Sequence, residues 1–136
     1  DAALASELAG RDVDSVLVGA DAILADGSVV NKVGTRSLAL AAAREDVPVY
    51  VVAAAAKVRP DETFHGETGD EADLYDGEAP VAVANPLFER TPAGLVDGVV
   101  TERGVLDVDE VATVATEHRN NATWNGGSGA SGGDRE

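Results

Sequence analysis

Two short segments carry the residue types that could bind an anion or move a proton. They are Gly19-Ala20-Asp21 and Asn31-Lys32-Val33-Gly34-Thr35. In parallel α/β proteins, ligands bind beyond the carboxyl ends of strands, where helix N-termini offer free N–H groups and a positive dipole end. Asn31 and Lys32 supply donors and a cation, while Gly34 and Thr35 leave backbone amides open to an anion. This set suits a phosphorylated small molecule.

A purely structural interpretation of the same residues stays open. Thr35 can be a helix cap, Lys32 a solvated charge and Asp21 an acid in a turn. The sequence has neither GxGxxG nor GxxxxGK[ST], the two phosphate-binding loops with the strongest signatures. The residue types alone therefore leave both interpretations available.

Spacing that would indicate a metal site is missing from the sequence. His65 and His118 are isolated from each other, and Asp70, Glu71 and Asp73 do not follow the EF-hand pattern. We expect no metal and no cofactor.

The order of apolar runs and turn signals predicts an α/β fold. Helices are expected at 2–9, 35–46 and from 107 onward, strands at 13–18, 49–53, 81–84 and 96–101, a hairpin turn at 26–27, and an acidic loop at 61–78. Strands without polar alternation, separated by helices, favour parallel pairing. The first helix has no strand before it, and a doubly wound sheet cut there exposes a strand edge. We therefore expect a mainly parallel sheet that lacks its first strand or strands. The apolar stretch 38–43 predicts a helix buried over much of its circumference.

Composition excludes several classes of function. Twenty-five acidic residues face ten basic ones, giving a formal net charge of −15, so a basic face for nucleic acid is not expected. No apolar run approaches the roughly 20 residues that cross a bilayer. The absence of cysteine excludes disulfides and a thiol nucleophile within these 136 residues and fits a cytoplasmic protein. High acidity with few lysines favours adaptation to a salt-rich cytoplasm, and an ordinary acidic protein is the alternative.

Four motifs in order carry a resemblance to a known family. They are VLVGADAI (16–23), DGSVVNKVGT (26–35), NPLFERTP (85–92) and VDGVVTERG (96–104). Over residues 1–118 the chain resembles the initiation factor 2B alpha/beta/delta-like family, which includes ribose-1,5-bisphosphate isomerase and S-methylthioribose-1-phosphate isomerase, and a halophilic archaeal source is expected. The resemblance implies a Rossmann-like, three-layer C-terminal domain over 1–119. The Gly/Ser-rich composition of the remaining residues predicts a disordered tail over 120–136.

The isomerase branch of this family implies roles for individual residues. Asp21 would be the catalytic acid/base, and Asn31 and Lys32 would hold the sugar phosphate. The second catalytic residue of those enzymes is a cysteine from an earlier segment, which this sequence does not contain. Methylthioribose phosphate isomerases usually carry Arg where Ala22 stands, which makes that substrate less favoured than ribose 1,5-bisphosphate.

The resemblance leaves three functions open. The first is a regulatory or binding subunit related to translation initiation, with a sugar phosphate or nucleotide in the pocket. The second is an aldose–ketose isomerase acting on ribose 1,5-bisphosphate, and the third is an inactive relative that only oligomerises. Expected partners are family members, as homo- or hetero-oligomers, and initiation factor 2 subunits. Expected binding residues are Gly19, Ala20, Asn31, Lys32, Gly34 and Thr35, with Asp21 catalytic in the enzyme case.

Overall fold

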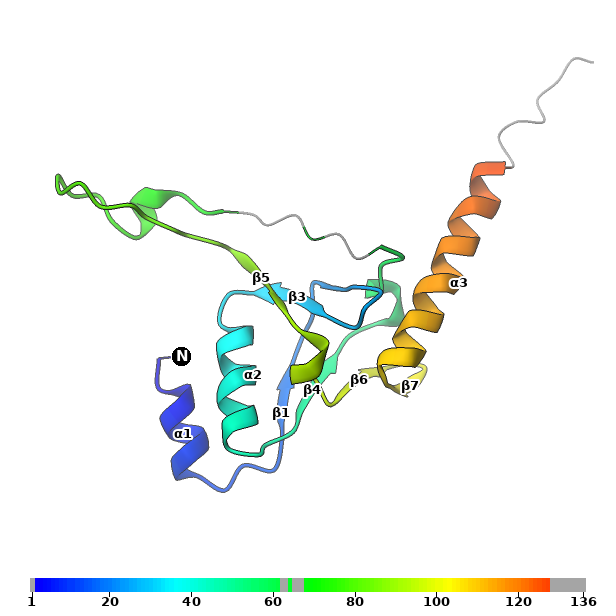
Figure 1. Ribbon diagram of the computed structural model, residues 1–136, viewed down its shortest axis with the longest axis horizontal. Helices are drawn as coiled ribbons and strands as arrows, with labels where there is room; N and C mark the ends of the chain where they lie inside the picture. The colour runs from blue at the N-terminus through cyan, green and yellow to red at the C-terminus, as the bar shows by residue number, and fades with distance from the viewer. Residues whose placement is uncertain (1, 62–63, 65–67, 128–136) are drawn as a thin grey trace, which may run out of the picture.

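The computed structural model describes residues 2–61, 64 and 68–127. Its three α-helices and two sheets are drawn in Figure 1. The helices are α1 (Leu4–Gly10), α2 (Thr35–Arg44) and α3 (Val108–Gly127), and three short 3₁₀ helices are η1 (Ala55–Lys57), η2 (Glu71–Asp73) and η3 (Ala93–Leu95). The strands are β1 (Val16–Val18), β2 (Ala22–Ile23), β3 (Val29–Lys32), β4 (Val49–Val52), β5 (Phe88–Thr91), β6 (Gly98–Thr101) and β7 (Gly104–Leu106).

The larger sheet confirms the predicted α/β class. Its order is β1-β4-β6-β7, with β1, β4 and β6 parallel and β7 antiparallel. Val16 pairs with Val49 and Tyr50 with Gly98. β1 lies at the edge, and no other strand among the described residues pairs with its free side.

Helices cover only one face of this sheet within the described residues. Val51, which points to the covered face, is fully buried in a cluster with residues of α3. Its neighbour Val52 is 48% exposed, and Leu17 and Val105 on the same open face are 65% and 59% exposed. Among the described residues, this open face of the sheet therefore has no covering helix.

The helix α2 is less buried than its sequence indicates. Ala39 and Ala42 are buried against Val16 and Val49, but Leu40 is 52% exposed. The expectation of burial over much of the circumference was wrong, because α2 has one sheet face beneath it and α1 along one flank. A helix that packs on one layer buries only a stripe.

The smaller sheet is antiparallel, with the order β2-β3-β5. The predicted hairpin at 26–27 is confirmed, and Gly27 supplies the positive φ of 83° that its turn requires. The strand expected at 81–84 was wrong: these residues form no strand, and Val81 is exposed. The pairing strand is instead β5, whose two central residues, Glu89 and Arg90, are charged and gave no apolar strand signal. β7 was also not predicted.

The described acidic loop extends away from the two sheets (Figure 1). Residues 70–82 are exposed throughout, as the prediction of a solvated loop requires. The loop closes on itself where Thr68 pairs with Pro86 and where the Asn85 side-chain amide donates to the carbonyl of Asp70 at 2.8 Å. The end of this loop delivers the chain into β5.

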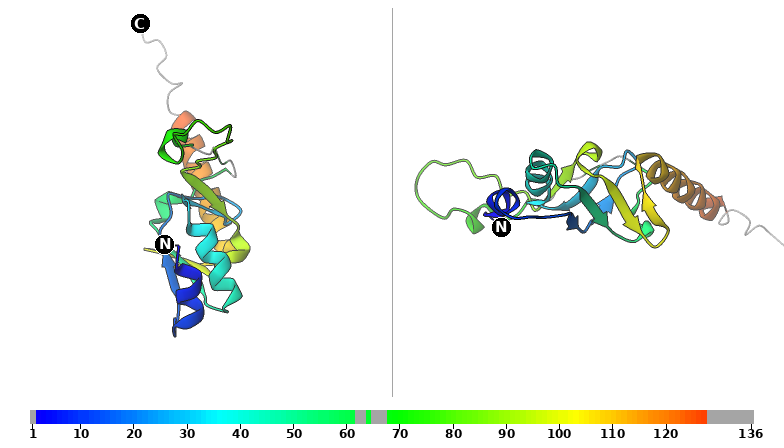
Figure 2. Two further views of the ribbon diagram at one scale, coloured as in Figure 1. Left: turned by 90° about the vertical axis from the view of Figure 1, so that its left-hand side faces the viewer. Right: turned by 90° about the horizontal axis from the view of Figure 1, so that it is seen from below.

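The last helix begins at the expected capping box. The Asp107 carboxylate accepts the N–H of Glu110 at 2.8 Å, and the Glu110 carboxylate accepts the N–H of Asp107 at 3.3 Å. α3 then continues to Gly127 and extends away from the body (Figure 2). The expected boundary at 119 therefore falls inside the helix, because a helix nucleated by packing at its start propagates through weaker helix formers. Residues 128–136 of the expected tail lie outside the described residues.

Candidate functional site

Four of the expected binding residues lie where β3 ends and α2 begins, in one hydrogen-bonded turn over residues 31–35. Thr35 Oγ1 accepts from Asn31 Nδ2 at 3.1 Å and donates to the carbonyl of Lys32 at 2.9 Å. Gly34 precedes the first helical residue with φ at 109°, a left-handed conformation that favours glycine. The spacing seen in the sequence therefore places Asn31, Lys32, Gly34 and Thr35 in a single turn at a helix N-terminus.

A cavity of about 570 Å³ lies between this turn and α1. Its size falls within the range of small-molecule sites. Lys32 and Thr35 contribute polar groups, and Leu4 and Leu38 contribute apolar walls. The complete lining is Ala2, Leu4, Ala5, Lys32, Val33, Gly34, Thr35, Ser37, Leu38 and Ala41. The cavity can therefore present the cation of Lys32 to an anionic ligand.

The segment 19–21 lies next to β3 but does not line this cavity. Gly19 and Ala20 follow the carboxyl end of β1, and the N–H of the exposed Asp21 donates to the carbonyl of Val30 at 2.9 Å. Asp21 is thus tied to the strand that carries Asn31 and Lys32. The structure brings 31–35 together and places 32–35 on the cavity. It leaves Asn31 and 19–21 outside the lining.

The two donors of β3 leave the strand on opposite faces. Asn31 pairs with Glu89 and Lys32 pairs with Phe88, and successive residues of a strand alternate in direction. A ligand that contacts both side chains must therefore lie beyond the carboxyl end of β3, where the chain turns into α2.

The carboxylate of Glu89 accepts hydrogen bonds from backbone N–H groups at the start of α2, where the sequence predicted amides open to an anion. Its Oε1 accepts the N–H of Gly34 at 3.0 Å and the N–H of Arg36 at 2.8 Å. The expectation of open amides was therefore wrong for the N–H of Gly34. This cap comes from β5, so no local signal around 31–36 could have found it.

Glu102 is a second carboxylate that the sequence did not single out. It follows β6, and both its oxygens accept the N–H of Ala55, at 2.9 and 3.2 Å. This hydrogen bond, followed by that of its own N–H, holds the pKa of Glu102 below its ordinary value of 4.5. Glu102 therefore fixes the start of η1 beside the carboxyl ends of β4 and β6.

A cluster of Arg90, Asp26 and Ser28 joins β5 to the β2–β3 hairpin. Arg90 pairs with Asp26, and Arg90 Nε donates to Ser28 Oγ at 2.8 Å. Burial alone would raise the pKa of Asp26, but hydrogen bonds from Ser28 and the charge of Arg90 outweigh it and hold the pKa below 3.8. The cluster anchors β5, and with it Glu89, against β3.

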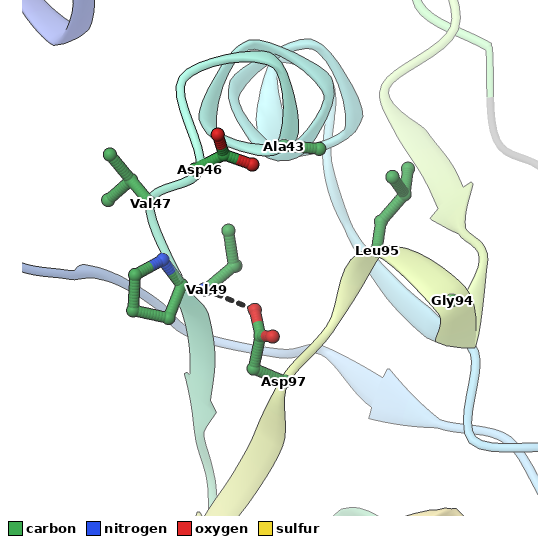
Figure 3. A pocket seen from close by; sticks show the side chains of 8 residues that line it. Ala43, Asp46, Val47, Val49, Gly94, Leu95 and Asp97 are labelled. Carbon is green, nitrogen blue, oxygen red and sulfur yellow. Dashed lines mark hydrogen bonds between the residues drawn. The ribbon is translucent and has the colours of Figure 1, made fainter.

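A smaller cavity of about 280 Å³ lies at the opposite, amino-terminal end of β4 (Figure 3). Asp97 Oδ2 accepts the N–H of Val49 there at 2.7 Å, and Asp46 also lines the space. The lining contains two acids and no lysine or arginine. It is therefore unsuited to a phosphate.

The described residues hold neither a cluster of metal-binding side chains nor a membrane-spanning helix. No group of three or more His, Cys, Asp or Glu side chains there could hold a metal ion. His118 Nδ1 lies 2.8 Å from the carbonyl of Val58, which gives that histidine a structural partner, and His65 lies outside the described residues. No helix in the same part of the chain is both long and apolar enough to cross a membrane.

Comparison with known proteins gives one family. Residues 1–108 match the model of the Initiation factor 2 subunit family. The chain is 40% identical over 116 residues to a ribose 1,5-bisphosphate isomerase of Haloferax volcanii, covering 79% of this chain and 36% of that protein. It is 43% identical over 115 residues to a methylthioribose-1-phosphate isomerase of Gemmatimonas aurantiaca, covering 79% and 32%. The chain thus spans about a third of the length of these relatives.

Two solved structures share the fold. A 5-methylthioribose 1-phosphate isomerase from Pyrococcus horikoshii matches 88% of this chain and 36% of its own, with a TM-score of 0.74 and 27% identity. The eIF-2B delta subunit from A. fulgidus matches 85% and 37%, with a TM-score of 0.71 and 31% identity.

Proposed function

Because the chain belongs to the Initiation factor 2 subunit family, we propose that it is the ligand-binding domain of an initiation factor 2B-like protein. It binds the phosphate of a sugar phosphate or nucleotide at the turn 31–35. The observation that carries this proposal is the hydrogen-bonded turn that places Lys32 and Thr35 together on a cavity of about 570 Å³.

The chemistry of the turn supports phosphate as the group bound. Lys32 supplies the positive charge, and the Asn31 amide, which gives one of its two N–H groups to Thr35 Oγ1, supplies the other as a neutral donor. The hydrogen bonds within the turn fix Asn31 and Thr35 before a ligand arrives, which lowers the entropic cost of binding. The positive end of the α2 dipole adds to the attraction.

The chain offers a matched pair of lysines for the test. Lys32 and Lys57 are its two lysines, and Lys57 lies exposed at the end of η1, outside the cavity. We expect Lys32→Met to weaken binding of ribose 1,5-bisphosphate at least tenfold in calorimetry, and Lys57→Met to leave the affinity within about twofold. Equal effects of the two substitutions would refute the assignment of the site.

A second function, aldose–ketose isomerisation of ribose 1,5-bisphosphate, is favoured by the 40% identity to the Haloferax enzyme. Opening the sugar ring and moving the carbonyl require a proton donor and an acceptor. Asp21 would be one of them, with Gly19 and Ala20 shaping the loop that presents it. The second group, by resemblance a cysteine, would lie outside this sequence.

The isomerase proposal is tested on the full-length protein in molar salt by following ribulose bisphosphate formation. We expect Asp21→Asn to reduce kcat at least a hundredfold, because the acid/base group is removed. Asp12→Asn, an exposed acid between α1 and β1, should leave the rate unchanged. Absence of turnover, or turnover that survives Asp21→Asn, would leave the binding function as the better proposal.

We further propose that the protein is cytoplasmic and assembles with copies of itself or with other family members. The exposed apolar face of the larger sheet supports an assembly. For the regulatory function, the partners are initiation factor 2 subunits. Analytical ultracentrifugation of the full-length protein, alone and with those subunits at native salt, tests both points. A monomer that binds no subunit would contradict them.

A further inference from the structure

Glu89 combines three properties that bear on ligand binding. It is the β5 partner of Asn31, so both side chains lie on one face of the smaller sheet. Its carboxylate accepts two N–H groups at the start of α2, from Gly34 and Arg36. It is half-buried and belongs to the edge strand of its sheet. A fixed negative charge therefore lies at the turn that carries Lys32.

This carboxylate makes the contacts that a phosphate oxygen makes at a helix N-terminus. Free N–H groups and the dipole attract an anion there, and in this chain the protein's own anion already takes them. A phosphate approaching the turn therefore finds the N–H groups of Gly34 and Arg36 used. It also meets a repulsion that grows with its own charge.

We propose that Glu89 is a specificity-determining residue of the proposed phosphate-binding turn, residues 31–35. It withholds two backbone amides from the ligand and penalises doubly charged phosphate more than singly charged phosphate. The ligand's phosphate is then held by Lys32 and Asn31, with the Thr35 hydroxyl orienting the Asn31 amide. This inference rests on the proposed phosphate site at residues 31–35.

Glu89→Gln is the informative variant, because the glutamine oxygen can still accept both N–H groups while the charge is removed. Titrations followed by the amide resonance of Thr35 at pH 8 would compare inorganic phosphate, mostly doubly charged, with dimethyl phosphate, singly charged. We expect the variant to bind inorganic phosphate about two- to fivefold more tightly, the range for one charge at an exposed helix end. The gain for dimethyl phosphate should be smaller, and both gains should shrink at 1 M salt.

Asp97→Asn is the matched control, since Asp97 also caps a backbone N–H but at the opposite end of the larger sheet. It should not change either affinity. If Glu89 were only a structural cap, Glu89→Gln would leave both affinities unchanged or weaken them equally, which overturns the inference. Absence of phosphate binding in both wild type and Glu89→Gln also overturns it.

Lys32→Met separates this inference from the proposed function. Phosphate binding that survives Lys32→Met refutes the site itself. Phosphate binding that needs Lys32 but does not respond to Glu89→Gln refutes only the role of Glu89.

Discussion

Replacing Val51 by alanine should destabilise the fold by about 2 kcal/mol, whereas the same change at Val52 should cost about 0.8 kcal/mol. The two valines are neighbours on β4 and point to opposite faces of the sheet. Val51 is fully buried in a cluster that includes Val99 and Val111, while Val52 is 48% exposed. The pair therefore compares the covered face of the sheet with the open one.

The magnitude follows from the atoms removed. Valine to alanine deletes two methyl groups, each contributing about 0.8 kcal/mol when fully buried, and the residual cavity adds a few tenths more. At Val52 about half of this surface is already in water. The loss of strand propensity is similar at both positions, so it cancels in the difference of about 1.2 kcal/mol.

Urea unfolding followed by far-ultraviolet circular dichroism, at one fixed salt concentration, measures both free energies of unfolding. The slope against urea should be the same for wild type and both variants, because neither change alters the surface exposed on unfolding by much. Equal costs for Val51→Ala and Val52→Ala, within about 0.5 kcal/mol, would refute the one-sided packing of the sheet.

Three further predictions concern charge and backbone conformation. Raising KCl from about 0.1 M to about 1 M should raise the melting temperature of the protein. The reason is that the screening length falls from about 10 Å to about 3 Å, which weakens the repulsion among the charges that sum to −15. A fall in melting temperature would contradict salt adaptation. Asp26 has a lowered pKa in the folded state, so its contribution to stability is complete above its unfolded value of 3.8 and is lost as pH falls through the lower folded value. Acid titration of Asp26→Asn, compared with wild type, should therefore show less stability lost below pH 4, and identical pH curves would count against the cluster. Gly34→Ala should lower the free energy of unfolding in urea by about 1–2 kcal/mol, since φ is 109° at Gly34. Gly10→Ala at the end of α1 should leave that free energy unchanged or raise it. Equal effects of the two substitutions would refute the strained turn.

The features that could be predicted from the sequence are those encoded by neighbouring residues. The apolar run before Gly19 and the run 49–53 contain β1 and β4, and the Ala-rich stretch after Gly34 is α2. The capping box of Asp107 and Glu110 needs only a spacing of three residues, and its hydrogen bonds are present. The turn 31–35 belongs to the same class, because its hydrogen bonds join residues three or four positions apart.

The strand β5 could not be predicted because its conformation depends on distant partners. Glu89 and Arg90 at its centre are poor strand formers by type. Arg90 finds Asp26 and Ser28 across 64 and 62 positions of sequence, and the backbone pairs with β3. The more apolar run 81–84 has no such partners, and three of its four residues, all but Val83, are exposed. Apolar pattern alone therefore selected the wrong segment.

The same dependence on distant partners changes how the acidity of the chain is interpreted. Glu89, Asp97 and Glu102 each accept a backbone N–H from a residue 47 to 55 positions away. In each case the carboxylate accepts a hydrogen bond from a backbone N–H at the start of a helix or strand. These charges therefore contribute to the stability of the fold in the way that a helix cap does. Surface acids such as those of the 70–78 loop make no comparable long-range contact to the sheets among the described residues. Charge that adapts the surface to salt can be neutralised with little change in structure, whereas truncating any of these three side chains removes specific hydrogen bonds, and neutralising them weakens those bonds. The acidic residues behind the net charge of −15 therefore form two populations, one that faces solvent and one that caps backbone N–H groups. Glu89 belongs to the second population, and its carboxylate lies at the turn where a ligand's phosphate would bind.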